Sequence, residues 1–216
     1  MKKYQIAVAV VAAVANFAGA AGAQAVSDRE DASRFVVLVG TDTLAVEDFV
    51  WGDGGLESDL RLFAADVRFH LAVGFGDDLL PRSFDADMWQ PADEPGPTIA
   101  SSMEFEGDSV FAEVVGAQTP EFQRIGTESG AVPFINLSFA LVEHAVRMRR
   151  LAGSGGEVPF FSWSNGQTFI AQVALGEDDS VTLTIGEVVL ELTADPNGRV
   201  LAGAVPAQNL TIVRVD

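Results

Sequence analysis

The chain contains two histidines, His70 and His144, which are its candidates for acid–base chemistry at neutral pH. A zinc site built from histidines is excluded, because such sites need more histidine and cysteine ligands than this chain offers. His70 shares a predicted strand face with Arg68, and His144 adjoins Glu143 beside the apolar stripe of a predicted helix. Histidines in such positions are more often partly exposed than functional. We therefore predict no metal site and no catalytic residue, and we keep Arg68 and His70 as ligand-binding candidates.

Ser154 lies in a glycine-rich stretch, Gly153–Gly156, that could be compared with the nucleophile turn of serine hydrolases. That turn requires glycine two residues before the serine, and Ala152 stands at this position. A flexible loop explains the stretch better. The chain also lacks the glycine-rich turn with a lysine that joins a strand to a helix in phosphate-binding loops, so we predict no cofactor.

One strand-like segment, Leu80–Met88, carries an arginine on its apolar side. Strict alternation places Arg82 on the same face as Phe84 and Ala86. An arginine directed into a protein interior needs a partner. Inside a barrel, Arg82 could pair with a buried acid or bind the acidic head group of an apolar ligand, and it is the third ligand-binding candidate. The alternative is an edge strand from which Arg82 reaches water.

Most of the chain is predicted to form β-strands. In Val67–Phe75, apolar residues occupy every second position, which is the period of a half-buried strand. Gly52–Gly55 and the Asn165-Gly166 pair each lie between two strand-like segments, and residues of these types favour tight hairpin turns. Comparable segments recur along the chain, and we predict roughly ten strands.

One segment departs from this pattern and predicts a helix at about residues 135–151. Apolar residues recur in it at intervals of three and four: Ile135, Phe139, Val142 and Val146. Asn136 or Ser138 could cap its start. A single helix among many short strands favours an antiparallel sheet curled into an open β-barrel, with the helix over its mouth or concave face. A β-sandwich is the alternative.

The first 25 residues have the pattern of a cleavable secretory signal peptide. Lys2 and Lys3 precede an almost unbroken apolar run, and Ala23-Gln24-Ala25 supplies the small residues that signal peptidase accepts. A membrane anchor is the alternative, but the apolar run is shorter than the ~20 residues of a spanning helix. We predict cleavage after Ala25 and an exported protein, in the periplasm or outside the cell, without a stable membrane anchor.

Cleavage would leave a flexible N-terminus at residues 26–33 and a single β-rich domain at residues 34–216. Lys2 and Lys3 are the only lysines among 13 basic residues, so the mature chain would keep 11 arginines against 31 acidic residues, a formal charge of −20. This charge excludes nucleic acid as a partner and disfavours an anionic membrane surface, because binding to phosphate depends mainly on lysine and arginine. Without cysteine, the domain depends on its apolar core rather than on disulfides.

Short stretches near both ends resemble sequences that recur in uncharacterised exported all-β domains of bacteria. They are Gly40-Thr41-Asp42-Thr43-Leu44, Asp195-Pro196-Asn197-Gly198-Arg199-Val200 and Val205-Pro206-Ala207-Gln208. In outline, the order of elements is also similar to the open barrels of periplasmic lipoprotein carriers. That resemblance implies an apolar concave surface for acyl chains. No carrier motif is present, so no residue receives a role from it.

These patterns favour an exported, non-catalytic β-domain that binds an apolar, lipid-like small molecule or another envelope protein. One alternative is a hydrolase that uses His70 or His144 with nearby acids, which requires these groups to converge in space. The other is a structural or accessory module, which needs neither a cavity nor a polar cluster.

Overall fold

The computed structural model describes residues 32–116 and 120–215, in which 15 strands form one sheet and one α-helix is present. The prediction of a mainly β chain with one helix and an open, curled sheet is confirmed. The estimate of roughly ten strands was too low. The predicted signal peptide and residues 26–31 lie outside the described residues.

The strands follow one another along the chain, with α1 (Phe139–Leu151) between β9 and β10 and the short 3-10 helix η1 (Pro206–Gln208) before β15. The strand bounds are β1 (Ala32–Val39), β2 (Asp42–Gly52), β3 (Gly55–Leu62), β4 (Val67–Phe75), β5 (Pro81–Trp89), β6 (Ile99–Glu106), β7 (Ser109–Val115), β8 (Glu121–Gly126), β9 (Val132–Phe134), β10 (Gly156–Ser162), β11 (Thr168–Leu175), β12 (Ser180–Ile185), β13 (Val188–Ala194), β14 (Val200–Val205) and β15 (Leu210–Val215).

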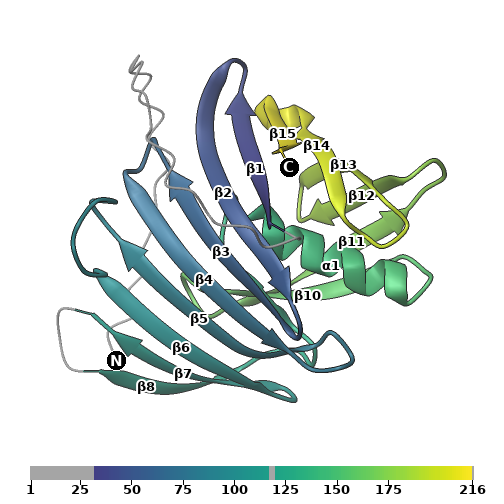
Figure 1. The fold of residues 1–216 in the computed structure, drawn as a ribbon. Coiled ribbons are helices and arrows are strands. Elements are labelled where there is room, and N and C mark those ends of the chain that lie inside the picture. Colours follow the sequence, from purple (N-terminus) through teal and green to yellow (C-terminus); the bar gives the residue numbers. More distant parts are fainter. Residues whose placement is uncertain (1–31, 117–119, 216) are drawn as a thin grey trace.

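The order of strands across the sheet is β8-β7-β6-β5-β4-β3-β2-β1-β15-β14-β13-β12-β11-β10-β9. Among these pairs only β9–β10 is parallel, and α1 supplies the crossover that a parallel pair requires. β15 pairs with β1, which makes the sheet continuous, whereas the end strands β8 and β9 do not pair with each other. Figure 1 shows the sheet bending around α1, with β1–β8 forming one wing and β10–β15 the other. We call the face toward α1 the inner face.

Apolar side chains from both wings fill the space around α1. In β4 (Val67–Phe75), buried and partly exposed residues alternate, as the sequence predicted. Phe35 of β1 stacks on Phe49 of β2 with 4.9 Å between ring centroids. Phe105 of β6 meets Phe161 of β10 edge to face at 5.9 Å, which joins the two wings. Removal of this apolar surface from water, at about 25 cal/mol per Å², is the main force that holds the curled sheet around its helix.

α1 fills the inner side of the curled sheet. Its eight consecutive residues Phe139–Val146 are all buried, and the helix contacts β2, β9 and β11. It begins later than the predicted Ile135, because Leu137 has a left-handed φ of 69° and Ser138 is the N-cap. The Ser138 hydroxyl accepts a hydrogen bond from the Leu141 N–H at 3.4 Å, so one of the two predicted capping residues does cap the helix.

Candidate functional site

Arg68 and His70, two of the residues predicted to bind a ligand, lie on the outer face of β4. His70 Nδ1 is 3.3 Å from Asp59 Oδ1, and the His70 side chain is 44% exposed. The hydrogen bond to Asp59 raises the pKa of His70, and partial burial opposes this rise. The Arg68 guanidinium stacks 4.2 Å from the ring centroid of Trp89. Both residues therefore occupy strand positions that face the solvent.

The third predicted residue, Arg82, does not point inward as strict alternation implied. The pairing of β4 with β5 shifts at Gly74 and Phe75, which leaves Arg82 as an extra residue outside the regular register. Its side chain is 54% exposed and pairs with Asp78 at 2.8 Å. Arg82 lies near the β4–β5 turn, far along the strands from His70, so the structure does not gather the three predicted residues into one pocket.

The second histidine, His144, lies on the inner side of the sheet and does not converge with His70. His144 is fully buried, and its Nε2 is 2.8 Å from the Leu79 carbonyl oxygen. Because a carbonyl only accepts, Nε2 carries the proton, and Nδ1 has no hydrogen-bond partner among the described residues. Burial lowers the pKa of His144 to about 4, so the ring is neutral near pH 7. The Phe75 ring lies 4.2 Å from it.

A cleft of about 710 Å³ opens beside His144, at the C-terminal end of α1. Glycine-rich turns form part of its wall, and Asp53 and Asp77 line it at exposed positions. The side chains that give the cleft its chemical character are Trp51, Phe75, Leu79, His144, Arg147 and Arg150. They come from β2, β4, the β4–β5 turn and α1, so only the folded chain brings them together.

The two arginines of the cleft have different surroundings. Arg147 stacks over Trp51, with its guanidinium carbon 4.2 Å from the ring centroid, and donates two hydrogen bonds to Glu143 Oε1 at 2.8 and 3.0 Å. Arg150 donates one hydrogen bond to the Ala194 carbonyl at 3.3 Å. Its Nε is buried without a hydrogen-bond partner, and no carboxylate among the described residues pairs with it. Arg150 therefore presents a cation that the protein does not neutralise by contact.

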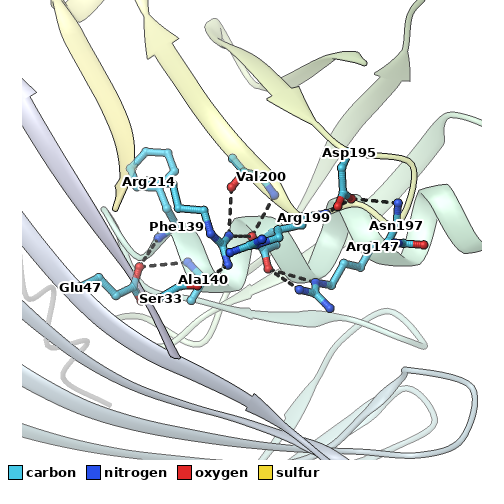
Figure 2. A network of polar contacts seen from close by, with 11 residues as sticks. Ser33, Glu47, Phe139, Ala140, Arg147, Asp195, Asn197, Arg199, Val200 and Arg214 are labelled. Atoms are coloured by element: carbon cyan, nitrogen blue, oxygen red, sulfur yellow. Dashed lines mark hydrogen bonds and ion pairs between the residues drawn. The ribbon is translucent and has the colours of Figure 1, made fainter. Parts of the chain in front are cut away.

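Behind the cleft, Glu143 of α1 is completely buried. Its partners Arg147, Val200 and Arg214 are labelled in Figure 2. Its Oε1 binds Arg147, while Oε2 accepts from the Val200 N–H at 2.9 Å and from the guanidinium of Arg214. The Arg214 side chain is only 4% exposed, and it also donates to the Ser33 hydroxyl at 2.6 Å. One carboxylate thus connects α1 with β14, β15 and, through Arg214, β1.

A second buried carboxylate, Glu47 of β2, meets the other end of the helix (Figure 2). Glu47 Oε1 accepts from the hydroxyls of Ser58 at 2.7 Å and Ser138 at 2.6 Å. Its Oε2 accepts from the N–H groups of Phe139 at 2.6 Å and Ala140 at 2.9 Å. Burial raises the pKa of Glu47, although these four donors oppose the rise. Glu47 satisfies backbone N–H groups that have no partner within the helix.

Glu47 and Glu143 hold the fold together rather than perform chemistry, because neither side chain is exposed and both oxygens of each are already hydrogen-bonded. The open cleft is therefore the candidate functional site. Sequence reasoning missed the cleft, and it also missed the two buried carboxylates, for which local signals existed. Glu47 shares a strand face with the apolar Ala45 and Phe49, and Glu143 precedes Arg147 by the four residues that place oppositely charged side chains together on a helix.

No protein-family model, curated protein or solved structure matches this chain. Within residues 32–116 and 120–215, no group of three or more histidine, aspartate or glutamate residues is arranged to hold a metal ion. No helix in the described part of the chain is long and apolar enough to cross a membrane. Of the two histidines considered for a hydrolase site, His70 pairs with the nearby acid Asp59, whereas His144 binds a backbone carbonyl, and neither has a serine among its described hydrogen-bond partners.

Proposed function

We propose that this protein is an exported, non-catalytic binding domain that holds a small amphiphilic molecule with one anionic group in the cleft at the end of α1. The observation that carries the proposal is Arg150, a partly buried cation with no carboxylate partner among the described residues, beside the aromatic rings of Trp51 and Phe75. Arg68, Arg124 and Arg149 also pair with no carboxylate among the described residues, but of these four arginines only Arg150 lines the cleft.

The lining favours a ligand with a flat or flexible apolar body. Trp51 and Phe75 stack on each other with 5.6 Å between centroids, and Leu79 extends this apolar wall. Arg147 is occupied by Glu143, so its contribution is to hold the Trp51 ring in place. Aromatic and aliphatic walls with one charged group are typical of small-molecule sites.

The acidic residues of the cleft restrict the charge of the ligand. Asp53 and Asp77 are both exposed where they line it, and they would repel a second anionic group. We therefore propose a monoanion, such as a fatty acid or an aromatic carboxylate or sulfonate. Because α1 fills the inner side of the sheet, the proposed site is this cleft rather than the concave acyl-chain surface that a lipoprotein carrier would use.

Binding of anilinonaphthalene sulfonate, an aromatic monoanion, tests this site by fluorescence titration. Arg150→Ala should weaken binding at least tenfold. Arg149→Ala is the matched control, because Arg149 is the neighbouring helix residue but donates to Ser154 and Gly155 instead of lining the cleft. It should change the dissociation constant less than twofold. Equal effects of the two substitutions would remove the proposal and favour a structural module.

Export is tested separately by the mass of the protein recovered from cells. The proposal rests on the sequence of residues 1–25. The expected product begins at Val26 and is found in the periplasmic fraction or the medium. Recovery of the uncleaved chain from the membrane fraction would instead favour an N-terminal anchor. Native mass spectrometry of the same material would identify any small molecule that the protein retains.

A further inference from the structure

The strand β8 (Glu121–Gly126) forms an outer border of the sheet and is hydrogen-bonded on one side only, to β7. Figure 1 shows it at the free edge of the β1–β8 wing. Five of its six residues are exposed, and Phe122 is 75% exposed. A strand with one unpaired edge and an exposed aromatic side chain is a template for another extended chain.

The opposite border of the sheet is protected. β9 has only three residues, Val132 and Pro133 are buried, and the strand contacts both α1 and β5. Proline also lacks the N–H that pairing with a further strand would use. The fold therefore covers one of its two edges and leaves the other open.

A groove of about 400 Å³ adjoins the open edge on the outer face of β6, β7 and β8. Phe111 and Phe122 supply its apolar part, and Phe111 is 40% exposed. Glu104 lies opposite Phe111 in the strand register, and Glu113 lies opposite Phe122. The aromatic side chains are thus interspersed with carboxylates.

The basic residue of this groove, Arg124, is engaged within the protein. Its guanidinium donates to the Ser109 hydroxyl at 2.9 Å and lies 5.6 Å from the centroid of the Phe111 ring. Glu104 and Glu113 outnumber Arg124, so the charged side chains that line the groove carry a net negative charge.

We propose that β8 is the docking edge for an extended segment of another protein in which a basic and an apolar residue lie two positions apart, so that both side chains are on the outer face of the sheet. Backbone hydrogen bonds to the free edge would supply affinity. On that face an apolar side chain would pack on Phe122, and a lysine or arginine side chain would extend over β8 toward Glu113 of β7. A second copy of this chain fits poorly, because its formal charge of −18 would be repelled by the same acidic surface. The proposal does not depend on the cleft, which shares no lining residue with this groove.

The test uses three labelled seven-residue peptides and the purified protein. In the first peptide lysine and phenylalanine occupy every second position in turn, with threonine between them; in the second the lysines are glutamates; in the third, of equal charge to the first, two prolines prevent strand pairing. Fluorescence anisotropy should detect binding of the first peptide and at least tenfold weaker binding of the other two. Hydrogen exchange should show new protection of β8 amides when the first peptide is bound.

Phe122→Ala should weaken binding of the first peptide at least tenfold. Ile170→Ala, at a residue of β11 that is 42% exposed in the other wing, is the matched control and should change affinity less than twofold. Equal effects of the two substitutions, equal binding of the proline peptide, or protection confined to other strands would overturn the proposal. So would a dimer in sedimentation that Phe122→Ala dissociates, since a second copy would then be the occupant. Arg150→Ala should leave peptide binding unchanged, which separates this test from that of the cleft.

Discussion

Glu47 and Glu143 are both completely buried beside the same helix, yet they are held by different kinds of donor. Glu47 is surrounded by neutral groups, two serine hydroxyls and two backbone N–H groups. Glu143 is surrounded by the guanidinium groups of Arg147 and Arg214 together with one backbone N–H. Glu47 caps the N-terminal end of α1, whereas Glu143 neutralises guanidinium groups, one of which, that of Arg214, is nearly buried.

This difference decides which substitutions each site tolerates. A hydroxyl can donate or accept, so Ser58 and Ser138 could turn to accept from an amide in place of the Glu47 carboxylate. Guanidinium and backbone N–H groups only donate. An amide nitrogen in place of either Glu143 oxygen would therefore face donors with no acceptor. Although the two carboxylates are equally buried, Glu47 should tolerate replacement by glutamine and Glu143 should not.

The largest effect is expected for Glu143→Gln. This change removes the negative charge between Arg147 and the nearly buried Arg214 and leaves an amide N–H₂ group facing donors. Breaking a buried ion pair from one side costs about 3–5 kcal/mol, and we expect the free energy of unfolding to fall by that amount in urea titrations. Glu157→Gln, at an exposed residue that binds Gln172, is the control and should change it by less than about 0.5 kcal/mol. If Glu143→Gln lowered the free energy of unfolding by less than about 1 kcal/mol, the proposed difference between Glu143 and Glu47 would be wrong.

Replacement of Glu47 by alanine and by glutamine should lower the free energy of unfolding by different amounts. Glu47→Ala leaves four donors without an acceptor and should lower the free energy of unfolding by about 3 kcal/mol. Glu47→Gln keeps an oxygen for the N–H groups of Phe139 and Ala140 and should cost less than about 1 kcal/mol. The pair is measured by the same urea titrations. If Glu47→Gln proved as harmful as Glu143→Gln, the distinction between neutral and charged surroundings would be wrong.

The titrations of His144, beside the cleft, and of Glu47, at the N-terminal end of α1, should change the stability with pH in opposite directions. The pKa of His144 is lowered from 6.5 to about 4, so between these pH values the unfolded chain takes up a proton that the folded chain refuses. The free energy of unfolding should therefore fall as the pH is lowered through this window, by up to about 3 kcal/mol. The raised pKa of Glu47 acts in the opposite sense, because the folded chain then takes up its proton first on acidification.

His144→Phe isolates the contribution of His144. The difference between its stability curve and that of the unsubstituted protein cancels the titration of other groups, including His70. The substituted protein should lose less stability between pH 6.5 and 4, whatever its stability at pH 7. Parallel curves would show that His144 takes up a proton in the folded state as easily as in the unfolded one.

Local sequence was sufficient for much of the fold. The alternation in Val67–Phe75 predicted β4, and the Gly52–Gly55 and Asn165-Gly166 turns predicted the hairpins β2–β3 and β10–β11. Ser138 was one of two predicted helix caps. The strand β9 was missed because three residues are too few to show the alternation that marks a half-buried strand. Turn residues and apolar alternation involve residues that are close together in the sequence, so the sequence alone is enough to predict the elements that they mark.

By itself, the sequence determined the mainly β character, the single helix with its cap, and the excess of negative charge, because each follows from residue types and short spacings. Only the tertiary structure decided which polar groups are buried together and which face the solvent. A shift in register turned Arg82 outward, and folding brought Glu47 to Ser138 and Arg214 to Glu143 across long stretches of chain. The cleft likewise needs β2, β4 and α1 together. Such contacts depend on how the sheet curls around its helix, and no local pattern encodes that curvature.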